Sequence, residues 1–274
     1  MKRHTFLPIM LLLSFPLWFA CTEEIEIELD DSFTRLVVEG GITNEAGPHS
    51  ISLSYTGSYY ENATAAKAEG ARLRISDGNQ VYALTETEPG LYQSGPELVG
   101  VPGNTYTLFI DSVWLDDRYQ FFTASCFMPE VPPVDSIRIA YNPSWDIWGV
   151  HLYAWDPPSK EHYLFRVYKN GLLMSDTIDE YIVINDDFFN GNYTFGVMVQ
   201  WLEVYEAQSG DSISLEMGSI TREYANFIED VQAQTGFNSP LFSGPPANIR
   251  GNIDNGAIGF FWAYSRLIES ALVP

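Results

Sequence analysis

The chain has 274 residues, and its 36 acidic side chains outnumber the 14 basic ones, which gives a formal net charge of −22. This balance argues against nucleic acid and against anionic lipid as partners. The length and the aromatic content suffice for two hydrophobic cores. Because Cys126 is the only thiol after Cys21, the sequence beyond Cys21 offers no intramolecular disulfide.

The first residues have the pattern of a secretory leader. Lys2 and Arg3 precede an uncharged run, which ends at Ala20. The run is shorter than the roughly 20 apolar residues of a spanning helix. Since Cys21 follows directly, we expect residues 1–20 to be a lipoprotein signal peptide and Cys21 to be the lipidation site.

Two further features qualify and extend this prediction. Trp18 stands where a typical lipoprotein signal has leucine, so ordinary secretion is the alternative. Six acidic residues follow within positions 23–31, and mutual repulsion of such charges extends a chain. Residues 21–32 are therefore predicted to form an acidic tether.

Short segments of period two follow over residues 33–128. In one of them, Ile51, Leu53 and Tyr55 alternate with serines, and turn signals such as Asp77-Gly78-Asn79 separate the segments. Strands of this length and spacing indicate an antiparallel sandwich. Residues 33–128 are predicted to be an N-terminal β-sandwich.

Three prolines in residues 129–133 predict an extended linker. Residues 134–274 continue with strands, and Trp155-Asp156-Pro157-Pro158, then Tyr163–Tyr168, then Asn170-Gly171 resemble fibronectin type III modules in their order. The predicted fold class is all-β, with two tandem Ig-like or fibronectin-III-like β-sandwiches.

One segment breaks the period of two. Ile220, Tyr224, Phe227, Ile228 and Val231 recur at helical spacing. We expect one amphipathic helix over residues 220–234, packed on the second sandwich through this apolar stripe.

Residues for nucleophilic or metal chemistry are sparse. The chain has no Gly-x-Ser-x-Gly elbow, which is the motif of one class of serine nucleophile. Cys126 has no evident histidine partner, and we expect it to be a small buried hydrophobic residue. The histidines His49, His151 and His162 lack the spacing of a metal site. No catalytic residue, metal or cofactor is predicted, and the chain is expected not to be an enzyme.

Carboxylates are abundant, which weakens each of them as a candidate. Adjacent pairs in turns do not indicate the fixed gap of a glycosidase. Residues 185–192 have a calcium-like composition without the spacing of an EF-hand, so an ordinary loop is expected and a calcium loop is the alternative. The acids considered are Asp116, Asp117, Asp156, Asp176, Asp179, Glu180, Asp186 and Asp187.

The remaining candidates for a binding surface are aromatic residues. Tyr141, Trp145 and Trp148 lie among turn-forming residues, and exposed rings there could stack on a sugar or dock on a protein. They are the candidate surface-binding residues. The alternative is that Trp148 enters the core and Trp145 covers its edge.

Several segments, taken in order, resemble one known family, the Bacteroidota outer-membrane lipoproteins classed as domain of unknown function 4249. Gly259-Phe260-Phe261 departs mildly from the Gly-Tyr-Phe of relatives. The matching pieces are Val37-Val38-Glu39-Gly40-Gly41-Ile42-Thr43-Asn44, Gly47-Pro48-His49, Gly70-Ala71-Arg72-Leu73, Gly90-Leu91-Tyr92, Gly103-Asn104-Thr105-Tyr106-Thr107-Leu108, Pro132-Pro133-Val134-Asp135-Ser136 and Pro245-Pro246-Ala247-Asn248-Ile249-Arg250-Gly251-Asn252-Ile253.

The resemblance implies a lipid-anchored protein of the outer membrane that faces the outside of the cell, with Glu23 and Glu24 as surface-export acids. It implies a TonB-dependent outer-membrane transporter as partner and no established reaction. We therefore expect a non-enzymatic accessory lipoprotein in nutrient uptake, whose small-molecule or glycan ligand is unknown. A carbohydrate-binding or adhesin-like surface module is the alternative, and a hydrolase is a further one.

Overall fold

The structure of the protein is a computed structural model that describes residues 34–57, 65–235 and 249–274. The predicted leader, Cys21, the tether with Glu23 and Glu24, and residues 245–248 of the family resemblance lie outside the described residues. The strands are β1 (Leu36–Thr43), β2 (Ser50–Tyr55), β3 (Arg72–Ser76), β4 (Val81–Ala83), β5 (Thr85–Glu88), β6 (Leu91–Gln93), β7 (Thr105–Leu115), β8 (Arg118–Phe127), β9 (Val134–Asn142), β10 (Ile147–Ala154), β11 (His162–Lys169), β12 (Leu172–Leu173), β13 (Ile182–Asn185), β14 (Val197–Glu203), β15 (Ser212–Ile220) and β16 (Ile258–Leu272).

The protein is mostly β, as the period-two segments predict, and its strands form several sheets. One hydrophobic core lies between the sheet β4-β3-β7-β8 and strands β1, β2 and β6. Ile51 and Leu53 are fully buried on β2, while the alternating serines are not. A second core lies between the sheet β14-β10-β9 and strands β11 and β15, where Phe165 and Leu215 are buried.

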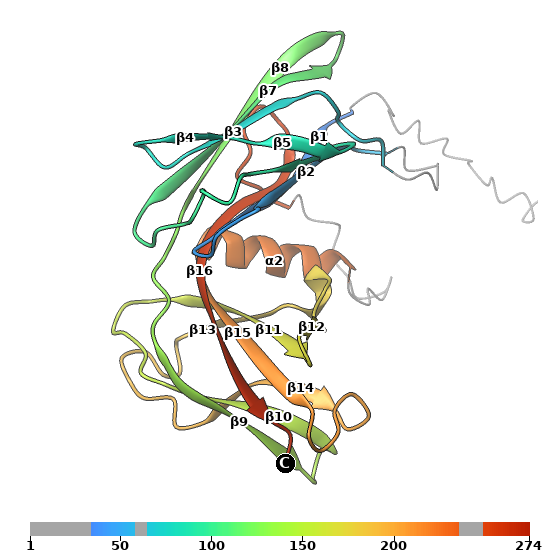
Figure 1. Ribbon diagram of the computed structural model, residues 1–274. Coiled ribbons are helices and arrows are strands. Elements are labelled where there is room, and N and C mark those ends of the chain that lie inside the picture. The colour runs from blue at the N-terminus through green and yellow to red at the C-terminus, as the bar shows by residue number, and fades with distance from the viewer. Residues whose placement is uncertain (1–33, 58–64, 236–248) are drawn as a thin grey trace, which may run out of the picture. The chain divides into compact units, whose positions relative to one another are not determined.

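The last strand, β16, is shared by the two halves of the chain. Its N-terminal part pairs in parallel with β1, and its C-terminal part pairs antiparallel with β15. Figure 1 shows this strand passing from beside β1 to the region of β9 and β10. The predicted linker, residues 129–133, joins β8 to β9. The sequence did not predict that one strand would link both predicted sandwiches into a nine-stranded sheet.

The predicted helix is α2 (Arg222–Thr235), and a short 3-10 helix, η2 (Ile178–Glu180), lies beside it. The helix contacts β11, β13 and β16, but its buried residues Tyr224, Ala225 and Ile228 join the first core rather than the second. It therefore packs against the second half of the chain on the sheet face that looks away from the second core. Among the described residues, no helix has the length and apolarity needed to cross a membrane.

Candidate functional site

The β7–β8 hairpin extends beyond its neighbour β3. The pairing of β3 with β7 ends at Arg72 and Asp111, whereas β7 and β8 remain paired as far as Leu115 and Arg118. Residues 112–121 thus form a hairpin tip that β3 does not cover (Figure 1).

The backbone of this tip is strained in three places. Asp116 and Asp117 both have positive φ, at 53° and 57°, as a tight two-residue hairpin turn requires. Ser112 has a φ of 66° beside the irregular register between Ile110 and Val113. Left-handed conformations cost energy for residues other than glycine. Aspartate is a common first residue of such a turn, whereas glycine is preferred at the second, so the backbone cost lies mainly at Asp117 and Ser112. Strain of this kind often accompanies a functional surface.

Three large aromatic side chains lie exposed on one face of the hairpin tip. Trp114, Tyr119 and Phe121 are 54%, 71% and 59% exposed. Trp114 and Tyr119 are directly paired across the strands, with ring centroids 4.9 Å apart at 74°. Phe121, two residues after Tyr119, projects to the same side. We call these three residues the hairpin aromatics.

The hairpin tip is also tied to the body of the fold. The hydroxyl of Tyr55 donates to the carbonyl of Trp114 at 3.0 Å, and Asn255 Nδ2 donates to the carbonyl of Phe121 at 2.8 Å. A hollow of about 580 Å³ beside it is lined in part by Arg72, Tyr119 and Phe121. The tip therefore presents its rings from a held backbone, which reduces the entropy lost on binding.

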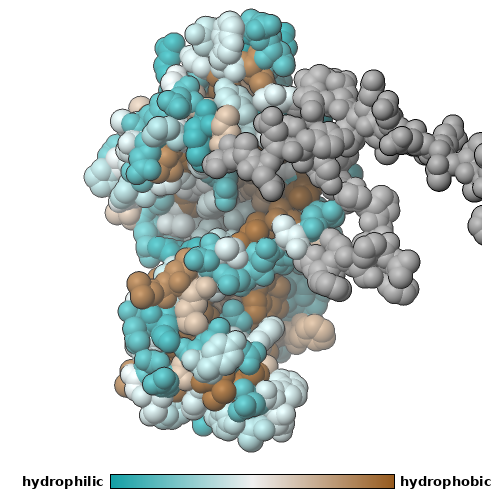
Figure 2. Space-filling model, turned by 90° about the vertical axis from the view of Figure 1, so that its right-hand side faces the viewer, coloured by the Kyte–Doolittle hydropathy of each residue, from teal (hydrophilic) through white to brown (hydrophobic). Residues whose placement is uncertain are grey.

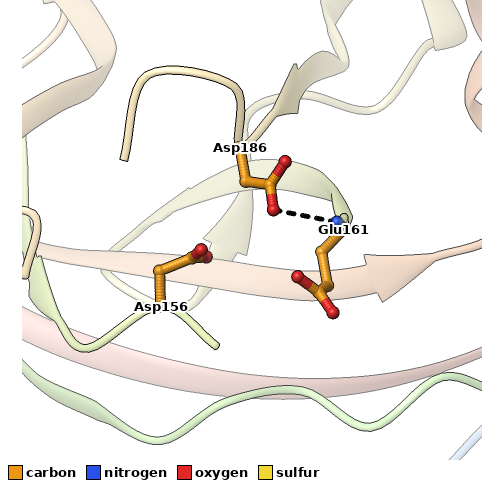
Figure 3. A group of neighbouring side chains, drawn as sticks. All are labelled: Asp156, Glu161 and Asp186. Atoms are coloured by element: carbon orange, nitrogen blue, oxygen red, sulfur yellow. Dashed lines mark hydrogen bonds between the residues drawn. The ribbon is translucent and has the colours of Figure 1, made fainter. Parts of the chain in front are cut away.

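A second feature is a group of three carboxylates, which we call the acid cluster: Asp156, Glu161 and Asp186. Asp156 follows β10, Glu161 precedes β11 and Asp186 follows β13. One oxygen from each lies within 4.8 Å of the others, and Figure 3 shows the three side chains converging. Asp156 and Asp186 are 7% and 1% exposed.

Most of the hydrogen bonds in the acid cluster connect the two loops that supply it. Asp156 accepts from the hydroxyl of Tyr163 at 2.7 Å and from the amide of Gly191 at 3.2 Å. Asp186 accepts from the amide of Glu161 at 3.0 Å. The acids thus hold the loop before β11 against the loop after β13.

The charges of the acid cluster are poorly compensated. Burial raises the pKa of Asp156, although its bonds to Tyr163 and Gly191 act in the opposite direction. Burial also raises the pKa of Glu161, and neighbouring Asp186 raises it further. Glu161 Oε2 is buried without a hydrogen-bond partner, and the nearby Lys160 pairs with Asp187 at 3.5 Å. Such a group is neutralised by protons or by a cation.

The chemistry open to the acid cluster follows from its position. Carboxylate oxygens are the donors that hard divalent cations prefer. Glu161 and Asp186 also line a cleft of about 590 Å³ together with His162. A cleft with two convergent acids is the sign that the hydrolase alternative requires.

The sequence indicated Asp156 and Asp186 as candidate acids but not Glu161, because nothing in the spacing of these residues shows that the two loops meet.

We expect Glu161→Gln to raise the unfolding temperature at pH 7 by about 1–3 °C. The raised pKa of Glu161 means that the folded state loses stability as pH rises from the unfolded value through the folded one. The neutral amide removes this loss, so the variant should match the wild type near pH 4. Thermal unfolding at both pH values measures the effect, and a variant that is less stable at pH 7 contradicts it.

Added calcium distinguishes the two ways of neutralising the acid cluster. If calcium binds there, it raises the unfolding temperature of the wild type and not that of Glu161→Gln. If protons neutralise the acids, calcium leaves the difference between the two proteins unchanged. Glu69→Gln, at an exposed glutamate outside the acid cluster, is the matched control.

The predicted aromatics divide between surface and core. Trp145 is 66% exposed and Tyr141 is 46% exposed, whereas Trp148 packs against the second core. The rings of Tyr141 and Trp148 lie 5.3 Å apart at 57°. Trp148 thus takes the core position of the alternative, although its buried Nε1 has no hydrogen-bond partner.

Other aromatic rings that the sequence did not indicate are also exposed. Besides the hairpin aromatics, Trp155 and Phe195 are 63% and 81% exposed at the end of the β14-β10-β9 sheet remote from Trp145. The sequence signal for the hairpin tip is Asp116-Asp117, which forms a turn between two strands that carry aromatic residues.

The histidines and Cys126 stand apart from the acid cluster, except for His162 in its cleft. His151 lies on β10 and His162 on β11, which belong to different sheets. His151 Nδ1 is 2.8 Å from the carbonyl of Gly196. Cys126 is buried, as predicted, and burial raises the pKa of its thiol to about 11.

Comparison with known protein families gives a match over most of the chain. The family described as Domain of unknown function (DUF4249) matches residues 22–268, which is most of the chain. No curated protein matches the sequence.

Proposed function

Because the chain belongs to the family described as Domain of unknown function (DUF4249), we propose that it is a non-enzymatic lipoprotein of the Bacteroidota outer membrane. In this proposal, Cys21 anchors the chain to lipid, and the acidic tether, residues 21–32, holds the folded part away from the membrane on the outside of the cell. The protein binds a TonB-dependent transporter and assists nutrient uptake.

The observation that carries this proposal is the hairpin tip with its hairpin aromatics. Tyr and Trp dominate the binding energy of protein interfaces. The three rings share one face, and hydrogen bonds to Tyr55 and Asn255 hold the backbone that presents them. We propose that this face contacts the outer surface of the transporter, where it presents a ligand or gates entry.

The alternatives rest on other observations. A carbohydrate-binding module predicts a row of coplanar exposed rings. Two ring pairs that include an exposed ring are instead tilted or edge-on, at 74° for Trp114 and Tyr119 and 54° for Trp155 and Tyr193. A hydrolase is best supported by Glu161 and Asp186, which line the same cleft. However, Asp186 already accepts a hydrogen bond from the backbone amide of Glu161.

A pull-down in mild detergent tests the proposed partnership. The tagged wild type should recover a TonB-dependent barrel, and changing the hairpin aromatics to alanine should lower recovery at least about tenfold, since interface rings each contribute ~1–2 kcal/mol or more. The matched control replaces one Trp, one Tyr and one Phe that are exposed elsewhere, Trp155, Tyr205 and Phe195. Equal loss in both variants, or no barrel with the wild type even after crosslinking, contradicts the proposal.

We expect Cys21→Ala to release the protein from the membrane fraction. Three acyl chains hold a lipoprotein lastingly, because each buried methylene contributes ~0.8 kcal/mol, and the variant lacks the thiol on which lipidation of the chain depends. Fractionation followed by immunoblotting measures the release, and Cys126→Ala is the control that removes the other thiol. A variant that stays in the membrane fraction, processed as before, shows that Cys21 is not the anchor.

A further inference from the structure

A pocket of about 450 Å³ lies between α2, η2 and the paired strands β1 and β16. Its wall is largely aromatic and includes Tyr181, Tyr224, Phe227, Phe260 and Trp262. Figure 2 shows the right-hand side of the molecule in Figure 1, which is the side toward which the C-terminal end of α2 points. Apolar surface gathers in the middle of this face. This volume and lining are typical of sites for small ligands.

The aromatic wall is held in one arrangement. Tyr224 stacks on Trp262 at 5.5 Å and 16°, and Phe260 packs on Tyr224 and Phe227 at 5.0 and 5.1 Å. Gln232 Nε2, on α2, donates to the carbonyls of Ile178 and Tyr181, both at 2.8 Å, and these two residues line the pocket. These bonds fix η2 to α2, so the walls are in place before a ligand arrives.

The charges at the pocket are all of one sign. Glu39 and Asp176 are exposed carboxylates in its lining, and no lysine or arginine of residues 34–57, 65–235 and 249–274 belongs to it. Arg166 lies over the ring of Tyr181 at 5.6 Å, but it is not part of the lining, and its guanidinium pairs with Glu216. A cationic ligand meets two acids here, whereas an anionic one meets no partner.

We propose that this pocket binds a small organic cation with an apolar or aromatic body. Faces of Trp and Tyr attract cations through their quadrupole, and the apolar wall covers the body of the ligand. The proposal is independent of the transporter partnership, because it concerns the purified chain alone.

Calorimetry on the purified full chain tests the proposal with three probes that share a benzene ring. Benzyltrimethylammonium should bind about tenfold more tightly than benzyl alcohol, as expected for a cation over aromatic faces, and benzoate should not bind. Equal binding of the three probes overturns the proposal. A pocket closed in solution by another segment or a second copy gives no heat with any probe, and this also overturns it.

Substitutions locate the binding. Trp262→Leu keeps an apolar wall but removes the ring, so it should weaken benzyltrimethylammonium by about fivefold to tenfold. Trp201→Leu, at a tryptophan outside the pocket, should change nothing. Glu39→Gln with Asp176→Asn neutralises two exposed side chains, and should weaken binding of the cation by about threefold while leaving that of benzyl alcohol unchanged. Unchanged affinity for the cation in both pocket variants overturns the proposal.

Discussion

Gly259→Ala should destabilise the protein by about 3 kcal/mol or more. Gly259 has a φ of +103° and pairs with Val38 where β16 runs parallel to β1. A methyl group on Gly259 would overlap the carbonyl oxygen of Val38. The substitution therefore adds a steric clash to a strained backbone, in the strand that both halves of the chain share.

Gly210→Ala is the matched control for this effect. Gly210 has a similar φ of +93°, but a methyl group there would meet open space. It should cost only about 1–2 kcal/mol, the price of the left-handed backbone. Chemical denaturation of the two variants separates the cost of the steric clash from the cost of the left-handed backbone. An equal loss of stability in both variants would show that β16 does not approach β1 closely at Gly259.

Glu216→Gln should cost about 3 kcal/mol, because it breaks a buried ionic network. Glu216 is fully buried on β15, and its Oε1 accepts from Arg166 Nε and Nη2 at 3.0 and 2.6 Å. Its Oε2 accepts from Arg266 and from the hydroxyl of Tyr168. The amide is neutral and accepts at only one end, so both largely buried arginines lose a charged partner and one of them also loses its hydrogen-bond acceptor on this side chain. Asp111→Asn, in an exposed pair with Arg74, should cost under about 1 kcal/mol.

The same network predicts a pH dependence. Burial alone would raise the pKa of Glu216, but Arg166 and Arg266 outweigh burial and hold it below its ordinary value near 4.5. The network therefore stabilises the fold above that value and stops doing so as pH falls through the lower folded pKa. The wild type and Glu216→Gln should converge in stability at strongly acid pH. A constant difference down to pH 2 contradicts this assignment.

The strands and the helix could be predicted because buried apolar residues recur along the sequence with the period of a strand or of a helix. Ile51, Leu53 and Tyr55 alternate as β2 requires, and Tyr224 and Ile228 lie four apart as α2 requires. The path of β16 could not be predicted in this way. Pairing between β1 and β16 joins residues more than 200 positions apart, and it depends on where Gly259 lets two backbones meet.

The candidate sites show the same limit. Asp156 and Asp186 were visible as acids, but only the fold brings the loop with Asp156 and Glu161 against the loop with Asp186. Trp148 was visible as an aromatic in a turn-rich segment, and the structure packs it against the second core. The hairpin aromatics flank Asp116-Asp117, so turn chemistry could have found them before the structure did.

Photo-crosslinking from the hairpin tip tests the proposed function most directly. A photoreactive phenylalanine replaces Tyr119 in cells that make the lipoprotein at its natural level. The same group at Tyr205, which is 78% exposed against 71% for Tyr119, is the control. The account predicts that Tyr119 forms a crosslink to a TonB-dependent transporter and that Tyr205 does not. Crosslinks of equal strength from both positions, or a transporter captured only from Tyr205, would contradict it.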